Sequence, residues 1–236
     1  MESAIYATLT RQSGLMREMQ VVAQNIANLS TTGFRREGVV FAEYVARMDA
    51  GPSLSMANAS GRVVDLTEGG LSQTGGTFDI AIRGEGFFLI ETPQGERLTR
   101  AGSFTPDAAG ELVTPDGYRL LDAGGAPVFV PPDAGPVTLG ADGTLSAQGR
   151  PLAEIGLWRP VDPLVLRREA GTLFDGGALE PAEGATLLQG FVEESNVNPV
   201  AEIARMIEVQ RAYEQGQAFL AREDERVRGV IQTLGR

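Results

Sequence analysis

The sequence predicts an α+β protein in which long N- and C-terminal helices, a coiled-coil-like pair, flank a central antiparallel β domain that is sandwich-like or barrel-like. Three observations predict this fold. Apolar residues recur with a helical period near both ends of the 236-residue chain. All 13 prolines lie between Pro52 and Pro199. Within that central region, short apolar runs alternate with turn-forming residues.

The chain divides into four predicted segments. We expect an N-terminal assembly helix at residues 1–34, an extended linker region at 35–70, the central β domain at 71–195 and a C-terminal assembly helix at 196–236. Small residues at 51–53 and 57–61 predict that the stretch from Arg35 to Arg62 is conformationally loose.

A heptad pattern predicts the N-terminal helix. Its seam advances by alternating steps of four and three residues, through Ile5, Leu9, Gln12, Met16, Met19, Ala23 and Ile26. Leu15, Val22 and Leu29 widen the apolar face. Gly33 is typical of the position that follows a helix, and we expect the helix to end there.

Short strands and turns are predicted for the centre. Residues 77–82 alternate between polar and apolar, and the turn at 84–86 leads into the apolar run 87–90. Further turn signals lie at 107–110, 115–117 and 142–143. Strand–turn–strand units at this spacing are typical of an antiparallel sandwich or barrel.

The C-terminal helix is predicted to begin at Asn198, which can cap it, and Pro199, which suits the first helical position. A second stripe recurs every seven residues, at Met206, Tyr213, Leu220, Val227 and Leu234. The flanking seam is polar in its middle, at Gln210, Gln217 and Asp224. An intramolecular helix pair remains one interpretation, but polar seam residues and helix length favour contacts between subunits.

Composition excludes most enzyme chemistry. The chain has no cysteine, no histidine and no lysine, which removes disulfides, the common zinc sites, Ser-His-Asp triads and Schiff-base lysines. We expect no cofactor, no metal and no small-molecule substrate. The net charge of −11 is concentrated in the middle of the chain and argues against nucleic acid as a partner. The sequence has neither a membrane-spanning apolar run nor a cleavable signal peptide at Met1.

Three local patterns could suggest a site, and each has a simpler interpretation. Gly84-Glu85-Gly86 lacks the third glycine of a phosphate loop and predicts a hairpin turn. The Asp-Gly pairs at Asp116, Asp142 and Asp175 lack calcium-loop spacing and also predict turns. Adjacent Glu193 and Glu194 would point to opposite faces of a strand, which favours solvated charge over a glycosidase pair.

Three groups of motifs resemble the flagellar rod and hook protein family. Residues 23–28 (AQNIAN) with 31–35 (TTGFR) resemble its N-terminal motif. Residues 194–198 (ESNVN) with 206–214 (MIEVQRAYE) resemble its C-terminal signature. Four central motifs resemble the β-domain core of that family: residues 84–88 (GEGFF), 98–104 (LTRAGSF), 110–114 (GELVT) and 116–121 (DGYRLL). The resemblance covers nearly the whole chain.

The resemblance implies a non-enzymatic structural subunit. Proteins of this family leave the cell through the flagellar type III export apparatus without a cleaved signal. They then polymerise helically into the basal-body rod, a hollow drive shaft that crosses the periplasm and transmits torque for motility. Their terminal helices form the inner tube, with the β domain outside it. The implied partners are copies of the chain itself, other proximal and distal rod subunits, and the export apparatus.

Within the family, the short chain argues against a hook protein. The opening residues 1–6 (MESAIY) and the compact length resemble the proximal rod type. Residues 215–219 (QGQAF) depart from the stretch usual in the distal rod type, which is kept as the alternative. From other classes, a periplasmic glycan-acting enzyme and a dimeric binding module also remain alternatives.

We expect the assembly interface on the apolar stripes of both helices. In the N-terminal helix it comprises Ile5, Leu9, Met16, Met19, Val22, Asn25, Ile26 and Asn28. In the C-terminal helix it comprises Ile203, Met206, Ile207, Gln210, Tyr213, Leu220, Val227 and Leu234. The family-motif residues beside the helices are Gly33, Phe34, Ser195, Asn196, Val197 and Asn198.

Overall fold

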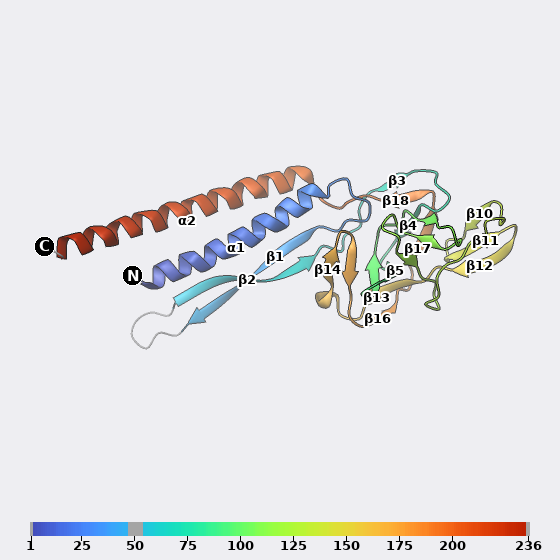
Figure 1. Cartoon of the computed structure of the whole chain (residues 1–236), viewed down its shortest axis with the longest axis horizontal. Coiled ribbons are helices and arrows are strands. Elements are labelled where there is room, and N and C mark those ends of the chain that lie inside the picture. The colour runs from blue at the N-terminus through green and yellow to red at the C-terminus, as the bar shows by residue number, and fades with distance from the viewer. Residues whose placement is uncertain (1, 47–53, 235–236) are drawn as a thin grey trace. The chain divides into compact units, whose positions relative to one another are not determined.

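The computed structural model describes residues 2–46 and 54–234 (Figure 1). Two compact units make up the chain. The helical unit takes in Met1–Ala27, Glu37–Val63 and Asn198–Arg236, and the β unit takes in Asn28–Arg36 and Val64–Val197. Helices at both ends with antiparallel sheets between them confirm the predicted α+β class.

The helical unit is built on α1 (Glu2–Ala27) and α2 (Pro199–Leu234), which lie side by side and run in opposite directions (Figure 1). The Asn198 side chain caps α2, because its Oδ1 accepts a hydrogen bond from the Ala201 N–H at 3.1 Å. Because α1 and α2 of one chain lie side by side, the helix pair is intramolecular. The sequence pattern had favoured contacts between subunits over this arrangement. Helix α1 ends at Ala27, well before the predicted stop at Gly33.

Several apolar side chains of the two helices are buried within the helical unit. On α1 they are Leu15, Val21 and Val22, and on α2 the buried one is Val209. These α1 residues lie beside the predicted seam and not on it, since Leu9 and Met16 remain exposed. The helices thus use one face for each other and leave part of the predicted seam uncovered.

A two-stranded sheet completes the helical unit. It consists of β1 (Glu37–Ala46) and β2 (Leu54–Val64), and β1 packs against α1. This stretch was predicted as a loose, extended connection, and its described residues 37–46 and 54–64 are extended strands that pair with each other. Small residues do not prevent pairing, because the backbone N–H and C=O groups of two extended segments satisfy one another.

The β unit contains one large sheet and several smaller ones. The path of the large sheet is β14-β15-β6-β5-β9-β8-β7, and β13 pairs with both β5 and β16. In that order its strands are Arg167–Ala170, Leu173–Asp175, Gly95–Thr99, Phe87–Thr92, Arg119–Leu120, Leu112–Val113 and Thr105–Pro106, with β13 at Leu157–Pro160 and β16 at Leu179–Pro181. A short 3-10 helix, η1 (Pro163–Val165), precedes β14.

The smaller sheets join distant parts of the chain. A three-stranded sheet has the order β10-β11-β12, which are Val137–Leu139, Thr144–Ala147 and Arg150–Glu154. Strand β17 (Thr186–Gln189) pairs with β4 (Ile80–Arg83), and β18 (Phe191–Glu193) pairs with β3 (Leu71–Gln73). The strand pairs described in the β unit are antiparallel.

Strand β5 lies between two apolar cores. Phe88 and Ile90 belong to one cluster of buried residues, and Phe87 and Leu89 belong to a second. Successive side chains of a strand point to opposite faces, so β5 is covered on both sides. The second cluster also includes Phe174, whose ring meets that of Phe87 edge-on with 5.8 Å between centroids.

Gly33 is required by a close backbone approach within the β unit. Its φ of +68° is in the left-handed region, and an added Cβ would lie 2.2 Å from the Ala101 nitrogen. Its N–H donates to the Glu193 carbonyl at 2.7 Å. The segment after α1 is therefore fitted against the β unit at a position where only glycine fits.

We predict that Gly33→Ala destabilises the β unit by about 2 kcal/mol more than Gly117→Ala. Gly117 is the matched control, because its φ is +84° but nothing lies within 4 Å of an added Cβ. Urea unfolding followed by fluorescence of Trp158, the chain's single tryptophan, measures both. Equal losses of stability in the two variants would contradict the close approach.

Candidate assembly surface

The predicted interface residues of α1 lie on two faces of the helix. Leu9 and Met16 are 48% and 41% exposed. Val22 and Asn25 are buried in the intramolecular pair. Half-buried positions are Ile5, Met19 and Ile26, together with Asn28 in the turn that follows the helix. Among the predicted interface residues of α1, the structure therefore leaves Leu9 and Met16 most open to a partner.

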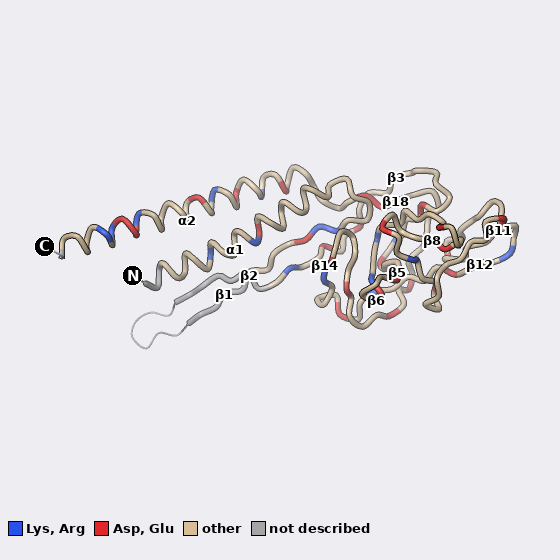
Figure 2. Tube along the Cα trace, viewed as in Figure 1, with Lys and Arg blue, Asp and Glu red and all other residues tan. Residues whose placement is uncertain are grey.

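The predicted residues of α2 are more exposed. Ile203 and Ile207 are 51% and 45% exposed, and Gln210 and Val227 are also exposed. Half-buried positions are Met206, Tyr213 and Leu220, and the side chain of Leu234 lies outside the described residues. Figure 2 shows acidic and basic residues mixed along α2, so this helix does not carry charge of one sign.

A different heptad line of α2 faces α1. Glu202 and Val209 are buried, Gly216 follows at the same spacing, and an added Cβ on Gly216 would lie 2.0 Å from the Gln12 Nε2 atom. The apolar pattern of the sequence does not reveal this line, because two of its three members are not apolar. The spacing of seven residues between its members is the sequence signal that could have indicated this line.

Three polar contacts set the register of the helix pair. The Gln12 Nε2 donates to the Tyr213 carbonyl at 2.8 Å, and the Arg205 Nε donates to the Glu18 carboxylate at 2.6 Å. The Asn25 Nδ2 donates to the Glu202 carboxylate at 3.1 Å. Polar contacts at defined positions favour one alignment of two helices over the others.

Asn25 also fixes the start of β1. Its Nδ2 donates to the Glu37 carbonyl at 2.9 Å, and its Oδ1 accepts from the Glu37 N–H at 3.0 Å. The side-chain amide thus satisfies both backbone groups of one residue, as a neighbouring strand would. Asn25, which was predicted as an assembly residue, has a role within the subunit.

Asn196 plays a similar part in the β unit, where three segments of the chain meet. Its Oδ1 accepts from the Arg36 N–H at 2.6 Å, and its Nδ2 donates to the carbonyls of Asp65 and Thr67 at 3.1 and 2.9 Å. Its own N–H donates to the Phe34 carbonyl at 3.3 Å. Among the motif residues, Phe34 and Val197 are buried, Ser195 is half-buried and Asn198 is exposed.

A buried ion cluster in the β unit consists of Glu193, Arg35 and Arg100. Glu193 accepts from Arg35 at 2.8 Å through Oε1 and from Arg100 at 2.7 Å through Oε2, and the three side chains are at most 2% exposed. Burial lowers the pKa of the Arg100 guanidinium from its usual value to about 10; Glu193 opposes this change and Arg35 adds to it. The expectation of solvated charge was therefore wrong for Glu193, although Glu194 is exposed.

The same cluster supports the turn between β4 and β5. The Arg100 Nη1 donates to the carbonyls of Gly84 and Gly86 at 3.0 and 2.7 Å. Both glycines have positive φ, and this segment forms the turn that the sequence predicts. Its carbonyls are held by a buried arginine, which is a structural arrangement and not a phosphate cradle.

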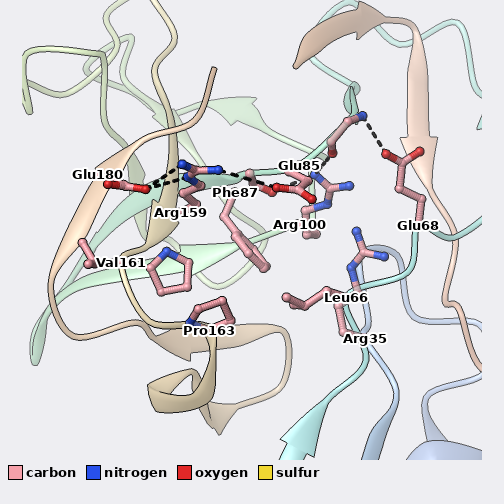
Figure 3. Close-up of a pocket in the computed structure, with 13 residues that line it drawn as sticks. Arg35, Leu66, Glu68, Glu85, Phe87, Arg100, Arg159, Val161, Pro163 and Glu180 are labelled. Atoms are coloured by element: carbon pink, nitrogen blue, oxygen red, sulfur yellow. Dashed lines mark hydrogen bonds and ion pairs between the residues drawn. The ribbon is translucent and has the colours of Figure 1, made fainter. Parts of the chain in front are cut away.

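A pocket of about 340 Å³ opens beside Arg35 and Arg100, with Phe87 and Leu66 among its apolar lining (Figure 3). Its carboxylates have bonded partners. Glu68 accepts from the Gly84 N–H at 2.7 Å, and Glu180 and Glu85 lie 2.7 and 3.7 Å from Arg159. Arg159 between two carboxylates gives this pocket a mixed, largely compensated charge.

No group of three or more acidic side chains within residues 2–46 and 54–234 is placed to hold a metal ion. Over the same residues, neither helix has the length and apolar character needed to cross a membrane.

We predict that Glu193→Gln destabilises the β unit by about 3–5 kcal/mol, because it leaves two buried guanidiniums without their carboxylate. Glu194→Gln is the matched control and changes stability by about 0.5 kcal/mol or less, since Glu194 is exposed. Thermal or urea unfolding of the two variants gives the comparison. A loss for Glu193→Gln as small as for the control would show that the cluster contributes little.

Two family models match the chain. The Flagellar hook protein FlgE/F/G D1 domain matches residues 81–147, within the β unit. The Flagellar basal body rod FlgEFG protein C-terminal model matches residues 188–233, which include nearly all of α2.

Full-length relatives agree with these matches. The chain is 38% identical to the flagellar basal-body rod protein FlgF of Caulobacter vibrioides, over 100% of this chain and 99% of the relative. It is 38% identical to FlgF of Mesorhizobium japonicum with the same coverage. It is 30% identical to the flagellar basal-body rod protein FlgG of Bacillus subtilis, over 97% of each chain. The chain therefore belongs to the flagellar basal-body rod family of structural, non-enzymatic proteins and is FlgF-like over its full length.

Proposed function

We propose that this subunit polymerises helically through the exposed faces of α1 and α2 and so forms part of the torque-transmitting shaft of the flagellar rod. One observation carries the proposal. After the two helices have packed on each other, large apolar side chains of both remain exposed, among them Leu9, Met16, Ile203 and Ile207. A soluble monomer gains nothing from such stripes, whereas a polymer buries them.

The energetics favour many modest contacts. Burial of apolar surface contributes about 25 cal/mol per Å², so a few half-exposed side chains stabilise one contact weakly. A helical polymer repeats each contact for every subunit, and the contributions act in parallel along the shaft. Polar positions on the stripes, such as Gln210, cost some affinity and select the register and the partner.

The proposed partners are copies of this chain and other rod subunits, proximal and distal. FlgF-like identity supports a place in the proximal rod, where a short segment would meet different neighbours at its two ends. We further propose export by the flagellar type III apparatus without a cleaved signal, because the resemblance to the rod and hook family implies that route. The acidic middle of the chain disfavours nucleic acid, and no small-molecule substrate is proposed.

We propose unequal roles for the predicted interface residues. Those that remain exposed, including Leu9, Met16, Gln210 and Val227, would contact neighbouring subunits. Those buried in the subunit, Val22 and Asn25, would set the shape of the helix pair that neighbours recognise. The motif residues Gly33 and Asn196 would hold the chain where it passes between the two units.

We predict that the double variant Ile203→Asp/Ile207→Asp weakens assembly at least tenfold. The two side chains lie one turn apart on α2, and placing carboxylates there opposes burial against a neighbour. Sedimentation velocity and light scattering across a concentration series measure the effect. Circular dichroism should be unchanged, because neither side chain is buried within the subunit.

Leu164→Asp is the matched control for that experiment. Leu164 is 82% exposed and lies on η1 in the β unit, so the same chemical change is made outside the helices. Its variant should assemble as the unmodified chain does. A discrete dimer that never extends, or equal loss of assembly in both variants, would count against polymerisation through the helices.

A further inference from the structure

The last part of α2 has no packing partner within the subunit. From Asp224 to Thr233 every side chain is exposed. The register contacts explain why: Asn25, Glu18 and Gln12 face Glu202, Arg205 and Tyr213, so the first residues of α1 lie beside residues of about 223–225. Beyond that point α2 continues alone (Figure 1). We call residues 224–234 the α2 overhang.

The α2 overhang carries an apolar stripe. Val227, Val230 and Ile231 have the i, i+3, i+4 spacing that places them on one face, and Ile231 is 64% exposed. Arg226 and Arg228 flank the stripe on its two sides, and each forms an ion pair within the helix, with Glu223 at 2.8 Å and with Asp224 at 2.9 Å. An amphipathic helical end of this kind is stable when the stripe is covered by another helix.

A groove on the helix pair has complementary features. It has a volume of about 440 Å³ and is lined by Gln12, Ser13, Met16, Arg17, Gln20 and Tyr213. We call it the Gln12 groove. Met16 supplies exposed apolar surface in the groove, and Leu9 continues that surface along α1. The groove therefore lies beside the part of the predicted α1 seam that the intramolecular pair leaves uncovered.

Gln12 itself points to a missing hydrogen-bond donor. The side chain is only 6% exposed, and its Nε2 donates to the Tyr213 carbonyl. A carbonyl can only accept, so this contact fixes the orientation of the amide. The Oε1 atom is buried and has no hydrogen-bond partner among the described residues. An acceptor in this state costs free energy until a donor reaches it.

We propose that the α2 overhang of one copy lies in the Gln12 groove of a second copy, an inference that rests on the proposed assembly through the terminal helices. The apolar stripe would cover Met16 and Leu9, and an overhang arginine would donate to the Gln12 Oε1. The overhang cannot reach the groove of its own chain, because one continuous helix separates residue 224 from Tyr213.

Two unlike surfaces meet in this contact. A heterologous contact of this kind leaves a free overhang at one end and a free groove at the other, so further copies can add. Overhang-to-overhang pairing would instead close a symmetric dimer. The proposal thus gives the direction of growth a structural basis in the unequal lengths of α1 and α2, 26 and 36 residues.

Introduced cysteines test the contact directly, since the chain has none of its own. Full-length Met16→Cys and Val230→Cys chains are mixed under assembly conditions and oxidised. We expect a disulfide between unlike variants, at a yield at least fivefold above that of Met16→Cys mixed with Gln232→Cys. Gln232 is the matched control, because it lies on the opposite face of the overhang.

A second pair of variants measures the contribution to assembly. Ile231→Asp should weaken assembly at least tenfold, whereas Gln232→Asp, its neighbour on the other face, should change it less than twofold. Both side chains are exposed, so the subunit should fold equally well in both variants, as circular dichroism would show.

The possible outcomes separate this inference from the proposed function. Disulfides only between like variants would overturn it in favour of a symmetric contact. Normal assembly of Ile231→Asp, together with loss of assembly in the Ile203→Asp/Ile207→Asp variant, would overturn the overhang contact alone. Failure of the unmodified chain to associate at all, in any mixture, would overturn both.

Discussion

Each terminal helix can cover only one face against its partner in the same chain, and this constraint decides what the rest of the structure can do. Helix α1 uses the face of Leu15 and Val22, and α2 uses the line through Glu202 and Val209. The apolar residues on the remaining faces stay exposed, and these are the faces that we propose neighbouring subunits cover. The proposed mode of assembly thus depends on pairing two helices that are each apolar on more than one side.

The β unit has a different role, which is to hold the chain segments that enter it from the helical unit. The chain passes between the units after residues 27, 36, 63 and 197. Glu193 joins Arg35 to Arg100, and Asn196 joins residues 34–36 to 65–67. A buried ion pair adds little net stability compared with apolar packing, but it is specific about which segments meet. Specific positioning suits a subunit whose purpose is mechanical.

The sequence predicted the helices and the antiparallel centre because both depend on local periodicity, which α2 and β5 display clearly. It did not predict which stripe of each helix would face inward. That choice rests on Gly216 and Gln12, where the missing side chain of one residue admits the amide of the other. Nor could it show that Glu193 is buried, since its two cationic partners are 158 and 93 residues away by their numbers in the chain.

The antiparallel pairing of unequal helices also constrains how neighbours can be arranged. With parallel helices of equal length, every apolar position could be matched inside one subunit or in a symmetric dimer. Here α2 extends beyond α1, so every copy has an apolar helix end and an uncovered groove at different positions along the helix pair. If neighbouring copies are to cover both the apolar end and the groove, they must be displaced along the helix axis. Repeated displacement of this kind about a common axis generates a helical array.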